Sequence, residues 1–146
     1  MGHPRKLRKK FSKPNHPWQK ARIDTENEFV TEYGFKNKRE IWKMSSVLGK
    51  FKVLSKKLIA SAGSQVEKER EQFLKRVISL GLLKNDARIE DVLGISLKNV
   101  FDRRLQTIVM KKGLANSIKQ ARQFIAHEHI AIGEKTITAP SYLVKI

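Results

Sequence analysis

The sequence contains no cysteine. This excludes a disulfide framework, a thiol nucleophile and a cysteine-ligated zinc site. Long hydrophobic runs are also missing, because the longest stretches without Asp, Glu, Lys or Arg are nine residues, at 58–66 and 136–144. A membrane-spanning helix needs about 20 mostly apolar residues, so the sequence predicts none. The basic N-terminal segment is not followed by an apolar stretch, so we expect no secretory signal.

Acidic residues are scarce. Asp and Glu number 14 against 31 Lys and Arg in 146 residues, which gives a net charge of +17. A charge this far from zero favours a polyanionic partner, either a nucleic acid or an anionic membrane surface. Hydrophobic residues make up 40% of the chain, which is enough for a folded core at this length.

The positive charge is concentrated in three blocks. Residues 1–20 and 34–60 each carry +7 and residues 101–146 carry +5, whereas residues 61–100 are nearly balanced at +1. We expect the balanced block to act as scaffold and the basic blocks to form a contact surface. Residues 1–17 are rich in Pro and basic side chains and have little to bury, so they predict an extended arm that orders on its partner.

Hydrophobic spacings of three and four residues predict a mostly helical body over residues 18–101. Trp18 and Trp42 fall within helical segments, and we expect both to be buried in the core or at an interface rather than to stack on bases. Segment 86–94 gives no clear pattern. Five helices are predicted. The first covers 18–33 and ends at Gly34, and the second is capped by Asn37 and carries an apolar stripe to Leu58. The third begins with a Ser64–Glu67 capping box and ends at Gly81, the fourth runs from Ser96 to Gly113, and the fifth is capped by Ser117.

Beyond His129 the hydrophobic residues alternate, which predicts short strands containing Ile130, Ile132, Ile137 and Val144. The predicted fold class is therefore α+β. A helical body precedes a helix pair with a small antiparallel sheet over residues 102–146. Because the sequence stops within a strand-like pattern, we expect a short C-terminal tail beyond it.

No motif for catalysis or cofactor binding is complete. Gly49-Lys50 lacks the hydroxyl residue of a phosphate-binding loop, and Ser96 lacks the second Gly of a nucleophile elbow. His127 and His129 could share one face of a strand, but no third metal ligand is in view. We therefore expect no enzymatic activity, no cofactor and no metal.

The segment from Asp102 onward combines basic and polar side chains on two helices. Lys119, Arg122 and Gln123 are three and four positions apart and so share one helix face. Unpaired N–H groups at a helix start near Ser117 suit a phosphate, and an arginine can donate two hydrogen bonds to one. The candidate binding residues here are Arg103, Arg104, Lys111, Lys112, Ser117, Lys119, Gln120, Arg122, Gln123 and His127. Further candidates from the other basic blocks are Arg5, Lys6, Arg8, Lys9, Lys10, Lys38 and Arg39.

Several motifs in this segment match a known family in their order. They are Arg103-Arg104-Leu105-Gln106-Thr107, Gly113-Leu114-Ala115-x-Ser117, Gln120-Ala121-Arg122-Gln123, His129-Ile130 and Pro140-Ser141-Tyr142-Leu143-Val144. Together they resemble the RNA-binding fold of the small-subunit ribosomal protein four family. The upstream run from Glu32 to Trp42 resembles the archaeal and eukaryotic branch of that family. The resemblance covers nearly the whole chain.

The resemblance implies a structural ribosomal protein located in the cytoplasmic ribosome. It implies direct and early binding to a multi-helix junction of small-subunit rRNA, near the side where mRNA enters and beside ribosomal protein five. The family's RNA-contact positions carry over to eight of the candidates, which are Arg103, Arg104, Ser117, Lys119, Gln120, Arg122, Gln123 and His127. Glu128 stands where bacterial relatives often have Gly in a His-Gly-His-Ile run.

Two other classes remain as alternatives. The same small domain is attached to some RNA-modifying enzymes and synthetases, but residues 1–101 offer no catalytic constellation. A general basic binder of nucleic acids or anionic membranes would explain the charge but not the ordered motifs.

Overall fold

A computed structural model of the chain describes residues 9–146. The architecture is helical with one small hairpin, which confirms the predicted α+β class. The elements are α1 Lys20–Tyr33, α2 Lys38–Ala60, α3 Ser64–Ser79, α4 Asp91–Gly94, α5 Leu97–Asp102, α6 Leu105–Lys111, α7 Ile118–Ala126, β1 Ala131–Ile132 and β2 Lys135–Thr136.

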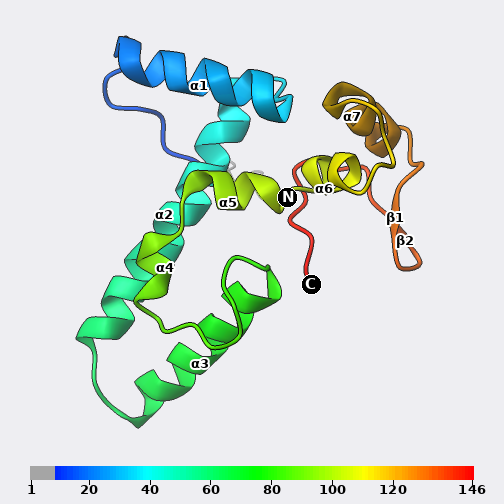
Figure 1. The fold of residues 1–146 in the computed structure, drawn as a ribbon. Helices are drawn as coiled ribbons and strands as arrows, with labels where there is room; N and C mark the ends of the chain where they lie inside the picture. The colour runs from blue at the N-terminus through cyan, green and yellow to red at the C-terminus, as the bar shows by residue number, and fades with distance from the viewer. Residues whose placement is uncertain (1–8) are drawn as a thin grey trace, which may run out of the picture.

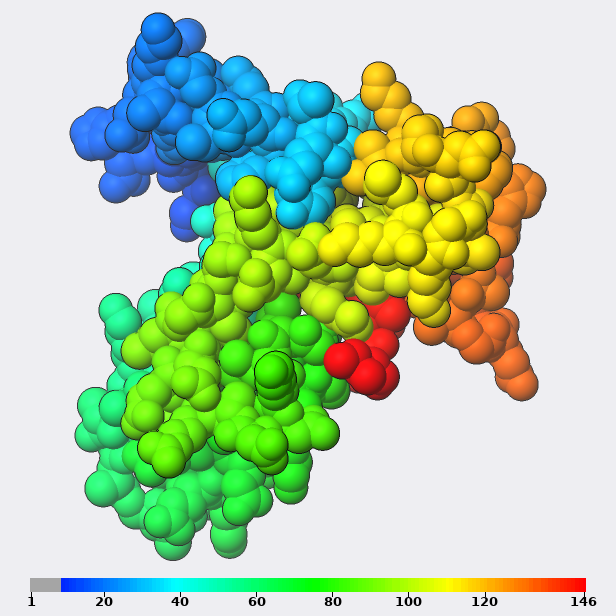
Figure 2. Space-filling model, in the orientation of Figure 1, coloured from blue at the N-terminus to red at the C-terminus, as the bar shows by residue number. Residues whose placement is uncertain are grey.

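The long helix α2 forms the spine of the molecule (Figure 1). Helix α1 crosses one end of α2, α3 lies at the other end, α4 lies along α2, and α5 packs across it and leads towards α6. Helices α6 and α7 and the hairpin form a separate lobe to one side, which the space-filling view shows beside the end of α1 (Figure 2). The last residues pass back between this lobe and the α3 region.

Two hydrophobic clusters correspond to this division. The larger one unites α1 to α5, and Phe101 at its centre makes edge contacts with Phe29 and Phe35. The smaller one lies between α6, α7 and the hairpin, around Ala121 and Ile125, which are fully buried. The clusters separate between Phe101 and Leu105, so the residues between them lie at the junction.

Several local signals act as the sequence predicts. Gly34 ends α1 in the left-handed conformation at φ 60°, and its N–H donates to the Val30 carbonyl. The Ser96 and Ser117 hydroxyls accept hydrogen bonds from backbone N–H groups three residues later, which caps α5 and α7. Asn37 occupies the N-cap position of α2, but its side chain makes no capping bond.

Other predictions of helix boundaries were wrong. Ser64 is the first residue of α3 and Gly63 is its N-cap, so the expected capping box does not form. Helix α1 begins at Lys20, and Trp18 before it is 88% exposed and therefore lies outside the core. Trp42 is half-buried, with its indole N–H donating to the Glu26 carboxylate at 2.9 Å.

The single helix predicted from Ser96 to Gly113 is broken into α5 and α6. Arg104 has an extended backbone (ψ 141°), and the next N–H, of Leu105, donates to the Tyr142 carbonyl at 2.8 Å. A bridge between Arg104 and Leu143 accompanies this bond. The break follows from pairing with a segment far along the chain, which helix periodicity does not reveal.

The strands are shorter than predicted. β1 and β2 are two residues each and pair antiparallel across a turn at Gly133. Val144 lies outside them and instead donates its N–H to the Arg103 carbonyl at 3.1 Å. Thus the C-terminal segment is attached to the junction rather than to the hairpin.

Candidate nucleic-acid interface

One row of polar side chains is exposed along α7. Lys119, Gln123 and His127 are four positions apart in turn, and all three are exposed. The opposite side of the helix buries Ala121 and Ile125 in the smaller core. The row is therefore free to meet a ligand.

The residues that begin α7 bind the helix itself. The Ser117 hydroxyl accepts from the Gln120 N–H at 3.2 Å, and the Gln120 side-chain oxygen accepts from the Asn116 N–H at 2.8 Å. This reciprocal pair fixes the first turn of the helix. An RNA contact by Ser117 or Gln120 would have to use a side-chain oxygen that already accepts one of these hydrogen bonds.

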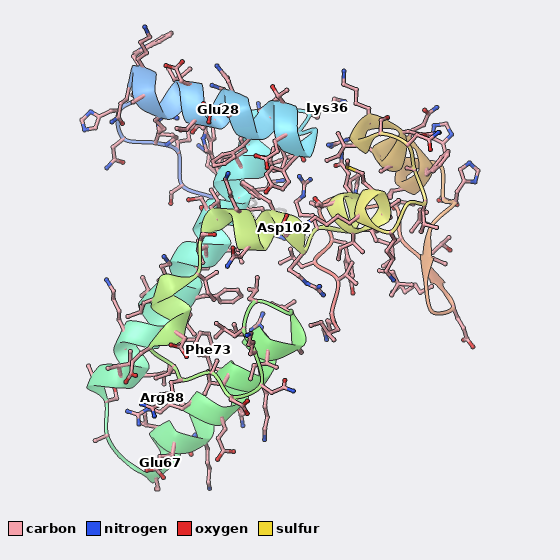
Figure 3. The ribbon with its side chains drawn as sticks, in the orientation of Figure 1. Glu28, Lys36, Glu67, Phe73, Arg88 and Asp102 are labelled. Carbon is pink, nitrogen blue, oxygen red and sulfur yellow. The ribbon has the colours of Figure 1, made fainter. Side chains whose placement is uncertain are left out.

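Lys111 and Lys112 lie at the end of α6 and are exposed. Lys111 pairs with Asp102 at 3.0 Å, with both side chains partly in solvent. Asp102 lies where α5 leads into α6 (Figure 3). Such an exposed pair contributes little stability, so Lys111 can exchange Asp102 for another anion.

Arg103 binds two backbone carbonyls instead of projecting into solvent. Its guanidinium donates to the carbonyls of Leu80 and Val144, each at 2.7 Å. These bonds join the end of α3 to the C-terminal segment. The structure therefore gives Arg103 an internal role, and the expected RNA contact stays a prediction for this partly buried side chain.

Arg104 is completely buried, with 0% of its surface exposed. Its guanidinium donates to the Glu40 carboxylate at 2.6 Å and lies 4.3 Å from the centre of the Phe35 ring. Burial lowers the pKa of Arg104, and the charge of Glu40 opposes that shift. A side chain with no exposed surface does not reach RNA, so the predicted contact does not fit the structure.

Arg122 lies at the same junction but reaches the surface, with 26% of its side chain exposed. Its guanidinium donates to Glu40 at 2.6 Å and, more weakly, to the Gly34 carbonyl and the Gln106 side chain at 3.3 and 3.4 Å. The predicted binding residue is therefore also a structural one. Substitution to alanine would remove both roles together.

Glu40 accepts from both arginines. Burial alone would raise its pKa, but hydrogen bonds and charges from Arg122 and Arg104 outweigh this effect and hold the pKa below its usual value. Both carboxylate oxygens are used, Oε2 by Arg104 and Oε1 by Arg122. The carboxylate is thus ionised and neutralised within the junction.

A pocket of about 250 Å³ opens above Glu40, between α2 and the C-terminal lobe. Its walls include the cations Arg39, Lys43 and Arg122. Arg39 and Lys43 are exposed and make no ion pair within the described part of the chain. This arrangement places the free positive charge of Arg39 and Lys43, both on α2, beside Arg122 of α7, which pairs with Glu40, around one opening that suits an anion such as a phosphate.

The basic arm can be described only from Lys9. Lys9 and Lys10 are exposed and line an open groove of about 960 Å³ along α2. Phe11 packs near Trp42, with ring centres 6.2 Å apart, and anchors the arm there. The predicted contacts Arg5, Lys6 and Arg8 lie outside the described residues. Lys38, predicted alongside Arg39, pairs with Glu26 at 3.6 Å.

The histidines at the end of α7 lie side by side. The rings of His127 and His129 are 6.2 Å apart and nearly parallel. Glu128 between them adopts the left-handed conformation at φ 66°, the only non-glycine residue among those described to do so. Glycine adopts this conformation without strain, which explains why a His-Gly-His run suits this turn.

Sequence reasoning missed Glu40 and Gln106. Gln106 is fully buried, and its amide donates to the carbonyls of Gly34 and Ile118 at 3.2 and 3.0 Å. The available signal for Glu40 was its position as the one acid among eight basic residues in 34–60. In the described residues no three His, Asp or Glu side chains gather as a metal site would need, and no helix is long and apolar enough to cross a membrane.

The chain is similar to known proteins over nearly its whole length. Residues 103–146 match the S4 domain. The small ribosomal subunit protein uS4 of Methanothermobacter thermautotrophicus is 46% identical over 99% of this chain and 85% of its own length. The protein of the same name from Methanococcus aeolicus is 50% identical over 100% of this chain and 83% of its own. That of Saccharolobus solfataricus is 44% identical over 100% and 81%.

Proposed function

This chain belongs to the uS4 family of small ribosomal subunit proteins, and we propose that it is a structural constituent of the small subunit that binds rRNA directly. The observation that carries the proposal is the 44–50% identity to archaeal uS4 proteins over nearly the full chain. Its role would be structural rather than enzymatic, and its place the ribosome in the cytoplasm.

The mechanism rests on the exposed cations. Lysines and arginines around the α2–α7 pocket and along α7 replace the counterions of RNA phosphates. Double-helical RNA is recognised mainly by its shape, because its major groove is too deep and narrow for side chains. Cations held at fixed spacing suit a folded rRNA junction better than a single duplex.

Finer parts of the proposal follow from the family resemblance. The protein would bind early in assembly, before other ribosomal proteins, near the side where mRNA enters and beside ribosomal protein five. Direct binding to naked small-subunit rRNA, without any other protein, tests the first part. Crosslinking within assembled subunits, read as contacts to ribosomal protein five and to bound mRNA, tests the other two.

Sedimentation of cell lysate at high salt tests the function as a whole. A peripheral electrostatic binder making several phosphate contacts loses about 10³-fold or more in affinity as salt rises. We expect the protein to remain in the small-subunit peak. Migration to the top of the gradient would contradict the proposal and favour a general basic binder.

A matched pair of variants tests the α7 row in vitro. Lys119→Ala with Gln123→Ala should weaken binding to small-subunit rRNA and reduce the salt slope by about one. Lys68→Ala with Gln72→Ala makes the same changes at the same spacing on the exposed surface of α3 and should leave binding nearly unchanged. Equal losses in both variants would show that only the total charge matters.

A further inference from the structure

Glu40 joins three elements that are far apart in the sequence. It lies in the first turn of α2 and accepts from Arg104, at the α5–α6 break, and from Arg122 on α7, both at 2.6 Å. α2 belongs to the spine and α7 to the separate lobe (Figure 1). Glu40 is therefore the ionic link between the helical body and that lobe.

The same contact fixes neighbouring groups. Arg122, held by Glu40, also donates to the Gly34 carbonyl and to Gln106. Gln106 in turn donates to the carbonyls of Gly34 and Ile118, which ties the turn between α1 and α2 to the start of α7. Glu40, Arg122 and Gln106 thus form one continuous set of hydrogen bonds across the junction.

The carboxylate of Glu40 balances the buried charge of Arg104, but it also lowers the positive charge of the surface beside it. It lies in the wall of a pocket whose other charged groups are the cations Arg39, Lys43 and Arg122. In a protein of net charge +17 that binds RNA, neutralising Glu40 would raise the charge and, by electrostatics alone, tighten binding. Its presence requires a benefit that exceeds this loss.

We infer that Glu40 is a positioning residue for RNA binding, which makes no contact with RNA itself and instead fixes the basic side chains of α2 and α7 at one spacing. This inference rests on the proposed rRNA binding. With the spacing set before binding, the two groups of cations meet the phosphates of a folded RNA without further ordering cost. The benefit concerns selectivity for a folded RNA rather than affinity for RNA in general.

The decisive comparison uses two variants with the same charge change. Glu40→Gln removes the charge and keeps the shape, whereas Glu28→Gln does so at an exposed position on α1 (Figure 3). The affinity of the full chain is measured for small-subunit rRNA and for an unrelated RNA duplex over a range of salt concentrations. Circular dichroism and thermal unfolding of each variant establish that it is folded.

We expect Glu40→Gln to weaken binding to small-subunit rRNA by about tenfold, with binding to the duplex unchanged or slightly tighter. Glu28→Gln should bind both RNAs as tightly as the unaltered chain, or slightly more tightly. If Glu40→Gln keeps the same preference for rRNA as Glu28→Gln, the inference is overturned. If the unaltered chain itself has no preference for rRNA, the proposed function fails instead.

A second variant decides the matter if Glu40→Gln does not fold. Arg104→Lys keeps the charge of a side chain that has no exposed surface and so makes no RNA contact, but it loses the guanidinium geometry that meets Glu40. We expect a lower preference for rRNA over duplex with an unchanged salt slope, because the number of cations is the same. A preference equal to that of the unaltered chain would overturn the inference.

Discussion

Arg104 and Glu40 are 64 positions apart in the sequence, and their side chains meet at 2.6 Å. Arg104 is fully buried, and its Nε and Nη1 atoms have no hydrogen-bond partner among the described residues. The face of its guanidinium lies over the Phe35 ring. The stability of this buried cation therefore depends chiefly on Glu40.

Removing one member of this pair should be costly. Arg104→Ala leaves a cavity and removes one partner of a mostly buried carboxylate, and we expect the free energy of unfolding to fall by about 3 kcal/mol. Arg88→Ala, at an exposed position between α3 and α4, should change it by less than about 0.5 kcal/mol. Urea denaturation of both variants checks this. Similar losses in the two would show that the pair does not stabilise the fold.

The low pKa of Glu40 gives the junction a pH dependence. Burial acts to raise this pKa, but hydrogen bonds and charges from Arg122 and Arg104 hold it below the usual 4.5. The folded state therefore binds this proton less tightly than the unfolded state, so the stabilisation is present above pH 4.5 and is lost as pH falls below it.

The difference in Tm between the unaltered chain and Glu40→Gln should consequently shrink as the solution is acidified below that value. Glu28→Gln, which changes an exposed carboxyl, controls for the general effect of acid. Thermal unfolding followed by circular dichroism at a series of pH values measures both differences. A Glu40→Gln difference that stays constant through the acid range would contradict the assignment.

Gly34 should be harder to replace by alanine than Gly113. An added Cβ would lie 2.7 Å from Ile118 Cγ2, in addition to the strain of alanine at φ 60°. Gly113 has a similar φ of 71° but open space around it. Gly113→Ala should cost about 1 kcal/mol from the backbone alone, and Gly34→Ala clearly more. Denaturant unfolding measures the loss in the free energy of unfolding for each variant, and the difference between the two losses gives the steric contribution at Gly34.

The two serines at helix starts should behave differently. The Ser117 hydroxyl caps α7, so Ser117→Ala should cost about 1 kcal/mol. Ser64 is already inside α3 and its side chain makes no capping bond, so Ser64→Ala should cost nothing measurable. Thermal unfolding compares them. If Ser64→Ala loses as much stability as Ser117→Ala, the result would contradict this difference and would support the capping box expected from the sequence.

Features determined by neighbouring residues were predictable from the sequence. The last turn of α1 depends on Gly34 and the first turn of α7 depends on Ser117, and the effect of each residue reaches only three or four positions. The α5–α6 break was not predictable in this way, because it depends on a hydrogen bond from Leu105 to Tyr142. Periodicity alone runs continuously through that break.

The candidate binding surface was predicted from charge, and charge does not distinguish an exposed arginine from a buried one. Lys119 and Gln123 are exposed as the helix face indicates. Arg103 and Arg104 are occupied internally, by the Leu80 carbonyl and by Glu40. Whether each arginine is exposed or buried depends on partners far away in the sequence, and a single sequence does not identify those partners. Arg104 also stands directly between two cores, where a polar link can be buried.

The bond from Arg103 to the Val144 carbonyl has a consequence for the order of events during synthesis. Arg103 is added 41 residues before its acceptor exists, and Glu40 is added 82 residues before Arg122. While the nascent chain grows, α2 can therefore form long before the side chains that attach the lobe to it. The hydrogen bonds of the junction can all form only after the segment that contains Val144 has left the exit tunnel. A complete junction therefore indicates that this segment has been synthesised.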